Sequence, residues 1–187
     1  MVLTPYIRAG RAVFTVVFKG FKERERPPGY VEPQVTSVKR REEFVNKATD
    51  LRRGLDYLAT RAEIDIRRLA YFGFSQGATE GIIYAALDER YQSVVMMASG
   101  IWRQPKDALP EITWTNFAPH VRAPKLMLNG RYDEVHYLTT MIEPLYKLYR
   151  DPKKLVLYDG SHTPPIEIAV PVINQWLDET LGAVQRE

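Results

Sequence analysis

The sequence contains no cysteine among its 187 residues and only three histidines. The lack of cysteine excludes disulfide bonds, thiolate metal sites and a cysteine nucleophile. It also fits the cytoplasm, which is the location that we expect. The chain carries no H-E-x-x-H segment, no Walker-type phosphate loop and no G-x-G-x-x-G fingerprint. We therefore expect neither a metal nor a cofactor.

Long apolar runs are also missing. None approaches the roughly 18 residues of a membrane span, and the N-terminal MVLTPYIRAGRAVF lacks the apolar core of a secretory signal. The net charge is +3 and the pI is about 9.0, but no stretch interleaves basic and aromatic residues. We expect neither a membrane nor a nucleic acid as partner.

The composition is that of an ordinary globular protein. Apolar residues make up 45% and charged residues 26% of the chain. A length of 187 residues suits one domain with one sizeable core. We therefore expect a single domain over residues 1–187.

Apolar segments typical of buried strands alternate with segments of helical periodicity, and the first of them is rich in β-branched residues. The expected strands are Ala12–Phe18, Arg68–Phe74, Ser93–Ala98, Lys125–Leu128 and Leu155–Tyr158. Strands that are apolar throughout and separated by helices form parallel sheets covered on both faces. The sequence therefore predicts an α/β fold with a mostly parallel sheet of about five strands and helices on both faces.

Helices are expected over residues 44–58, 78–87, 137–149 and 171–181. Thr36 or Ser37 could cap the first of these helices. Pro144 indicates a kink or break in the third, and Pro171 suits the first position of the last. Ligands of such sheets bind beyond the carboxyl ends of the strands, so functional residues are expected there.

One such residue is Ser75, in the segment GFSQG between a predicted strand and a predicted helix. A serine on a sharp turn in this context is typical of a nucleophile elbow. The flanking Gly73 and Gly77 would let strand and helix approach closely, and the Gln76 amide would be one oxyanion donor. The bare pattern arises by chance in about one chain in twenty of this size, but its position makes chance a poor explanation.

A serine hydroxyl needs a base, and histidine is the commonest one. His162 follows the last predicted strand in the segment DGSHTPP, which places it at the same sheet edge. His136 stands near the start of a helix and could line a pocket, whereas His120 lies in an irregular stretch. A lone histidine is more often structural than catalytic, and position alone favours His162.

The acid of a triad should follow the strand before the last. Asp133 does so in NGRYDE, and it would orient His162 and stabilise its imidazolium form. Glu134 is the neighbouring alternative for the acid. The alternative role for Asp133 is a structural one, as the N-cap of the helix that follows. The order serine, acid, histidine along the chain is that of the fold with the nucleophile elbow.

The segment 100–122 joins the third and fourth predicted strands and is expected to form a lid or a pocket loop. It contains Trp102, Trp114 and Phe117, which we assign with His136 to a substrate pocket. The alternative is that both tryptophans pack on the core.

GFSQG, LMLNGRYDE and YDGSHTPP together resemble the α/β-hydrolase superfamily, and within it the dienelactone-hydrolase and prolyl-oligopeptidase-like esterases. PYIRAGRAVF and DYLATRAEIDIRRLAYFGFSQGA extend the resemblance to hydrolase domains at the C-terminus of bacterial multidomain regulators and kinases. The resemblance covers nearly the whole chain. It implies ester hydrolysis through an acyl-enzyme, with Ser75, Asp133 and His162 at the positions of the family triad.

The chain departs from this pattern at its N-terminal side. Sheets of this superfamily run in the order 1-2-4-3-5-6-7-8, and Ala12–Phe18 aligns with the fourth strand, so the first three have no counterpart. The loop that supplies a second oxyanion donor is then missing too, and Gly20 or Phe21 could replace it. Either Ala12–Phe18 pairs with Arg68–Phe74, or another chain fills the gap, or the chain is a fragment. An edge strand that is left exposed favours association, so we expect a homodimer through Ala12–Phe18.

The sequence thus predicts a serine carboxylic-ester hydrolase for small or short-acyl esters. The alternative is a non-catalytic interaction module that keeps the fold and its residues, or a fragment of a larger protein. A peptidase ranks below both because no segment resembles a gating propeller domain.

Overall fold

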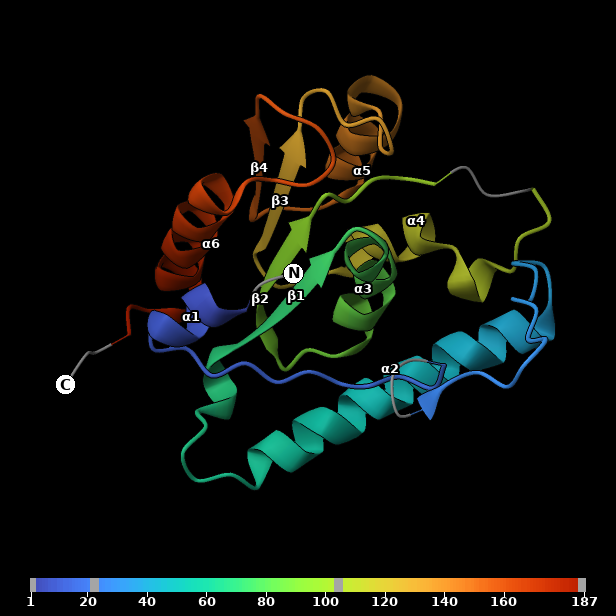
Figure 1. Ribbon diagram of the computed structural model, residues 1–187, viewed down its shortest axis with the longest axis horizontal. Helices are drawn as coiled ribbons and strands as arrows, with labels where there is room; N and C mark the ends of the chain where they lie inside the picture. Colours follow the sequence, from blue (N-terminus) through green and yellow to red (C-terminus); the bar gives the residue numbers. More distant parts are fainter. Residues whose placement is uncertain (1–2, 21–23, 103–105, 185–187) are drawn as a thin grey trace. The chain divides into compact units, whose positions relative to one another are not determined.

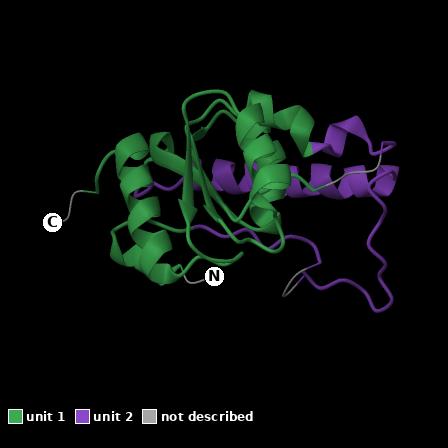
Figure 2. Cartoon of the chain, turned by 90° about the horizontal axis from the view of Figure 1, so that it is seen from above, with its two compact units in different colours: residues 1–13, 65–102, 114–187 green, residues 14–64, 103–113 purple. Residues whose placement is uncertain are grey.

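The computed structural model describes residues 3–20, 24–102 and 106–184 (Figure 1). Contacts between Cα atoms divide the chain into two compact units. The first comprises residues 1–13, 65–102 and 114–187, and the second residues 14–64 and 103–113 (Figure 2). The expectation of one domain over residues 1–187 stays a prediction.

A parallel sheet of four strands, in the order β1-β2-β3-β4, forms the centre of the first unit. The strands are β1 (Leu69–Phe74), β2 (Tyr91–Met97), β3 (Lys125–Gly130) and β4 (Lys153–Tyr158). They match four of the five predicted strands. The prediction of an α/β fold with a parallel sheet is confirmed.

Helices cover both faces of this sheet. On one face α6 (Ile166–Leu181) packs with α1 (Thr4–Arg8), and on the other lies α3 (Gln76–Leu87) (Figure 1). The shorter elements are η2 (Ile66–Arg68), α4 (Trp114–Phe117), η4 (Ala118–His120), the π-helix η5 (Leu138–Ile142) and α5 (Glu143–Leu148). Among the described residues, no helix is long and apolar enough to cross a membrane.

The core lies on both sides of the two central strands. Val95 and Met97 of β2 belong to a buried cluster with Ile173 and Trp176 of α6. The residues between them alternate to the opposite face, where Met96 is fully buried. Strands that are apolar on both faces need helices on both sides, which is the pattern seen in the sequence.

The second unit contains α2 (Val38–Ala59) and the short turn η3 (Pro110–Ile112). Ser37 caps α2, because its hydroxyl accepts a hydrogen bond from the Arg40 amide at 3.2 Å. This confirms the expected helix and chooses Ser37 over Thr36. The amide of Leu109 donates to the Val35 carbonyl at 3.3 Å and so ties the segment before η3 to this unit.

The strand predicted at Ala12–Phe18 does not form, since residues 11–18 are irregular and pair with no strand in the described part of the chain. Alternate apolar side chains of this segment contact α2 instead. A Cβ on Gly54 would lie 2.7 Å from the Phe14 ring and 3.3 Å from Val16. Alternating apolar side chains are typical of a strand, but here they pack an extended segment against a helix. The homodimer through this edge remains a prediction, without the strand from which it was inferred.

Of the two prolines that the sequence singled out, one takes its expected role and the other does not. Pro144 does mark a break, since the π-helix η5 ends at Ile142 and α5 takes Pro144 into its first turn. Pro171 does not begin the last helix, because α6 starts at Ile166 and contains Pro171 in its interior. A proline there has no N–H for the carbonyl four residues earlier and crowds that carbonyl. The helix forms nevertheless, and Ile173 and Trp176 are buried on it.

Replacing the exposed Pro171 by alanine is therefore expected to stabilise the protein. The substitution restores one helical hydrogen bond and removes the clash, which is worth up to about 3 kcal/mol in a helix interior. Pro144→Ala is the matched control, because a proline in the first turn costs little. Urea unfolding followed by circular dichroism measures both. Equal changes in the two variants would contradict this account of α6.

Candidate active site

Ser75 stands on the turn between β1 and α3 in a conformation that few non-glycine residues adopt. Its φ is 51° and its ψ is −116°. The Ser75 amide donates to the Met97 carbonyl at the end of β2 at 2.8 Å. The Ser75 carbonyl accepts hydrogen bonds from the Ala78 and Thr79 amides, both at 3.0 Å, and so begins the helix. The serine is therefore held by both neighbouring elements, as a nucleophile elbow requires.

The two glycines of GFSQG differ in what surrounds them. A Cβ on Gly73 would lie 2.5 Å from the Gly77 carbonyl oxygen and 2.7 Å from the Ala78 Cα. A Cβ on Gly77 would meet nothing within 4 Å. Within this motif, the close approach of strand and helix thus depends on Gly73, and the expectation for Gly77 was wrong.

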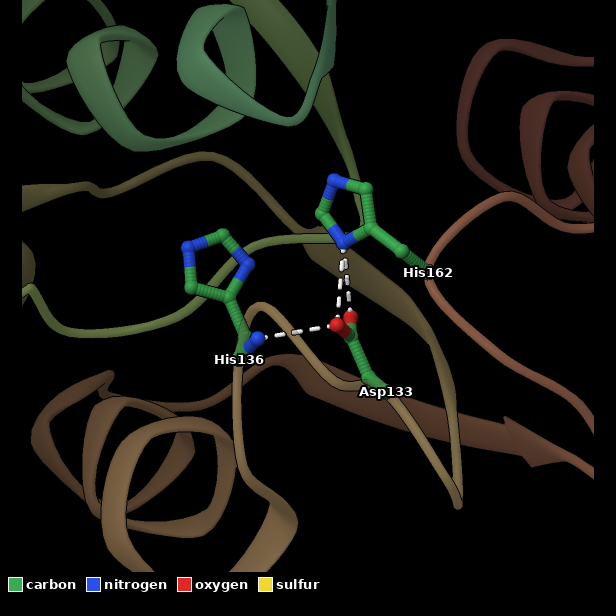
Figure 3. Close-up of side chains that lie close together, drawn as sticks. All are labelled: Asp133, His136 and His162. Carbon is green, nitrogen blue, oxygen red and sulfur yellow. Dashed lines mark hydrogen bonds and ion pairs between the residues drawn. The ribbon is translucent and has the colours of Figure 1, made fainter.

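Ser75, His162 and Asp133 form one chain of hydrogen bonds. The Nε2 atom of His162 lies 2.8 Å from the Ser75 Oγ. Its Nδ1 atom lies 3.0 and 2.9 Å from the two carboxylate oxygens of Asp133 (Figure 3). These are hydrogen-bonding distances on both sides of the imidazole ring. The arrangement can orient the ring and accept the serine proton.

Backbone amides fix the Asp133 carboxylate in place. The Oδ1 atom accepts hydrogen bonds from the amides of Val135 and His136, each at 2.8 Å, and the side chain is fully buried. The neighbouring Glu134 is exposed. The N-cap of the following helical segment is Tyr137, so Asp133 does not cap that helix. Of the alternatives weighed from the sequence, the structure places Asp133 against the histidine.

The loop that carries His162 is anchored to the ends of β3 and β4. The Tyr132 amide donates to the Gly160 carbonyl at 3.0 Å, and the Tyr158 hydroxyl donates to the Ser161 carbonyl. Burial, and then the charge of Asp133, raises the pKa of Tyr158 to about 12, so the phenol remains a hydrogen-bond donor. A side chain on Gly130 would overlap the carbonyls of Gly160 and Ser161. The sequence analysis did not predict this close approach. The glycine at the end of the predicted strand could have indicated it, because a glycine there allows two backbones to come close.

His136 lies beside the triad and is fully buried. Its ring centre is 5.4 Å from that of His162 and 4.9 Å from that of Trp102, which it meets edge-on. Burial lowers the pKa of His136, and the Asp133 carboxylate and the Ala98 backbone oppose this only in part. A Cβ on Gly100 would lie 2.8 Å from the ring. The imidazole is therefore tightly enclosed and neutral near pH 7.

The four predicted pocket residues differ in their surroundings. His136 stands next to His162, and Trp102, which is 43% exposed, lies beside His136. Trp114 is buried in α4, which packs against α3, and Phe117 ends the same short helix. Trp114 thus takes the core position that was its alternative assignment. Phe74, which the sequence did not single out, lies with its ring centre 5.7 Å from that of His162.

The oxyanion donors can be assigned only in part. Gln76 is the first residue of α3, so its amide has no acceptor within the helix and stands at the positive end of the helix dipole. The Gly20 amide donates to the Arg24 carbonyl at 2.6 Å and is thereby engaged, against our expectation. Phe21 lies outside the described residues. Residues 103–105 of the predicted lid also lie outside them, so the lid assignment stays a prediction.

Among the described residues, one group could hold a metal ion, which the sequence did not lead us to expect. Ligand atoms of Asp133, His136 and His162 all lie within 4.8 Å of one another. The group shares two members with the hydrogen-bond chain to Ser75.

Comparison with solved structures identifies proteins with a similar fold. An acetyl xylan esterase from a Paenibacillus species aligns with 86% of this chain and 61% of its own, at 20% identity and a TM-score of 0.66. One from a Thermoanaerobacterium species aligns with 81% and 59%, at 18% identity and a TM-score of 0.64. A Klebsiella pneumoniae protein assigned as a dienelactone hydrolase aligns with 73% and 62%, at 20% identity and a TM-score of 0.61.

These likenesses show that the chain has an α/β-hydrolase fold of the dienelactone-hydrolase type. The chain spans about three fifths of the length of these proteins, which fits the missing N-terminal strands. No family model matches the chain, and no curated protein matches it.

The contrast between the two motif glycines can be tested by substitution. Gly73→Ala is expected to lower both stability and any Ser75-dependent activity, because the new Cβ must push strand and helix apart. Gly77→Ala is the matched control and should fold with little change. Thermal unfolding and fluorophosphonate labelling of Ser75 report the two effects. A tolerated Gly73→Ala would contradict the close approach.

The buried His136 predicts a loss of stability in mild acid. Its pKa is lowered in the folded state, whereas an unfolded histidine titrates near pH 6.5. Below about pH 6.5 the unfolded chain takes up a proton that the folded chain resists, so the free energy of unfolding falls. We expect the parent to lose more of this free energy between about pH 7.5 and about pH 5.5 than His136→Gln does. Equal losses in urea titrations would show that His136 does not titrate in this way.

Proposed function

We propose that this chain is a serine hydrolase that cleaves small or short-acyl carboxylic esters through an acyl-enzyme on Ser75. The observation that carries the proposal is the chain of hydrogen bonds from Ser75 through His162 to Asp133. Two of the structural neighbours are acetyl xylan esterases, which supports an ester with a small acyl group as substrate.

The first half of the reaction forms the acyl-enzyme. The Ser75 Oγ attacks the ester carbonyl carbon while its proton moves to the Nε2 atom of His162. Asp133 keeps the proton of His162 on Nδ1 and stabilises the imidazolium ion that results. The negative oxygen of the tetrahedral intermediate accepts a hydrogen bond from the Gln76 amide. The intermediate collapses when His162 returns its proton to the leaving alcohol.

The second half releases the acid. A water molecule gives a proton to His162 and attacks the acyl carbon. The second tetrahedral intermediate then breaks down to the carboxylic acid as His162 returns the proton to the departing Ser75 Oγ. The same three side chains serve both halves, so one geometry suffices. Phe74 packs on the His162 ring, which limits the ring positions compatible with both steps.

The oxyanion site sets the expected rate. Loss of one oxyanion donor typically lowers turnover by about a hundred- to a thousandfold. With Gln76 as the assigned donor, a slow esterase is the natural expectation for this chain. The alternative from the sequence is a non-catalytic module. Such a module would show no Ser75-dependent turnover, whereas a slow esterase would.

The test is hydrolysis of p-nitrophenyl acetate and butyrate by the purified chain. We expect Ser75→Ala to lose all activity above background, whereas Ser161→Ala keeps it, because Ser161 is exposed and its backbone carbonyl, which the substitution retains, accepts the Tyr158 hydrogen bond. Acetate should be the better substrate if the acyl site is small. Equal rates for the parent and Ser75→Ala would reject the proposal and leave the non-catalytic module.

A further inference from the structure

Three side chains at the sheet edge bring metal-binding atoms together. A carboxylate oxygen of Asp133 and one ring nitrogen each of His136 and His162 lie within 4.8 Å of one another (Figure 3). Imidazole nitrogen and carboxylate oxygen are common zinc ligands, at about 2.0–2.2 Å from the ion. Tetrahedral ligands at that distance stand about 3.3 Å apart. Small movements of the rings would therefore complete a three-ligand site.

Two of the three ligands already lie close to each other. The Nδ1 atom of His162 lies 2.9 Å from the Oδ2 atom of Asp133. The Oδ1 atom accepts the amide hydrogen bonds of Val135 and His136, which fixes the direction of the carboxylate. Such outer hydrogen bonds are what hold metal-binding side chains in position.

The third ligand is the buried histidine His136. His136 is fully buried, and among the described residues neither of its ring nitrogens has a partner with full hydrogen-bond geometry. A buried polar group without a partner costs free energy, so each instance calls for a reason such as a bound ion. Figure 3 shows the ring on the same side as His162 and Asp133, with one nitrogen facing them.

We propose that Asp133, His136 and His162 bind a zinc ion, with a fourth position left for water. The side chain of His162 is 14% exposed, whereas that of Asp133 is fully buried. His162 is thus the solvent side of the site, and its loop is where an ion would enter.

A zinc ion at this site switches off the triad, a consequence that rests on the proposed function. Coordination through Nδ1 requires that atom to lose its proton, and the neutral ring then carries its single proton on Nε2. In that tautomer Nε2 donates to the Ser75 Oγ and cannot accept its proton. No electron is transferred, and removal of the ion restores the original tautomer. Zinc is therefore a reversible inhibitor.

The composition of the chain limits the other side chains that could bind zinc strongly. It has no cysteine, and His120 is the one histidine outside the group. His120 is exposed in η4, so His120→Gln removes an imidazole without touching the site. Any zinc bound through surface carboxylates would persist in every variant.

The experiment is calorimetric titration of the full chain with Zn²⁺ alone. We expect one equivalent to bind to the parent, to His120→Gln and to Ser75→Ala, which keeps all three ligands. His136→Gln and His162→Gln should each bind Zn²⁺ at least about tenfold more weakly, because even the loss of a residue that only orients a metal ligand has an effect of about this size. Co²⁺ should give the visible absorption bands of a tetrahedral ion in the parent, which tests the site even if the His136 variant does not fold.

Ester hydrolysis gives the second readout. If the chain hydrolyses esters, Zn²⁺ should inhibit the parent and His120→Gln equally, and a chelator should restore the rate. Zinc binding without any hydrolysis would overturn the proposed function but not the metal site. Hydrolysis with neither stoichiometric Zn²⁺ binding nor tetrahedral Co²⁺ bands would overturn the metal site. Equal affinity in all five proteins would do so too, since it points to surface carboxylates.

Discussion

The parallel register of the sheet is the constraint on which the site depends. Pairing aligns Phe74, Met97, Leu128 and Val156 across the four strands, so their carboxyl ends meet at one edge. Strands β3 and β4 continue for two further residues, and the loops with the acid and the histidine begin beyond them. A shift of register by one residue would turn every side chain to the opposite face and separate the three groups. Chemistry at this edge therefore follows from the packing of the core.

The same edge concentrates features that do not favour stability. Ser75 has a positive φ, Asp133 is a buried carboxylate, and His136 is a buried imidazole without a partner of full hydrogen-bond geometry among the described residues. Strain and buried polar groups persist where the surrounding structure determines them, and they gather at functional sites. Here the backbone of β2 holds the serine and two loop amides hold the carboxylate. The imidazole of His136 is enclosed by its neighbours but has no comparable hydrogen bonds among the described residues, and the proposed ion would supply its partner.

Local patterns in the sequence were sufficient for the sheet and for the three residues that the structure brings together. Four apolar runs became strands, and Ser75, Asp133 and His162 follow three of them. The failures concern interactions between distant segments. The run Ala12–Phe18 has a strand's composition but packs on α2, and no local pattern distinguishes a strand partner from a helix partner. The enclosure of His136 depends likewise on Gly100, a neighbour that only the folded chain provides.

The central claim is that His162 and Asp133 activate Ser75 for covalent chemistry. The most direct measurement is reaction of the chain with a fluorophosphonate, followed by peptide mass spectrometry. The account predicts one adduct per chain, on Ser75, with labelling that is slowed strongly in His162→Gln and less in Asp133→Asn. Modification of other serines at the same rate, or labelling of Ser75 that is unchanged in His162→Gln, would contradict it.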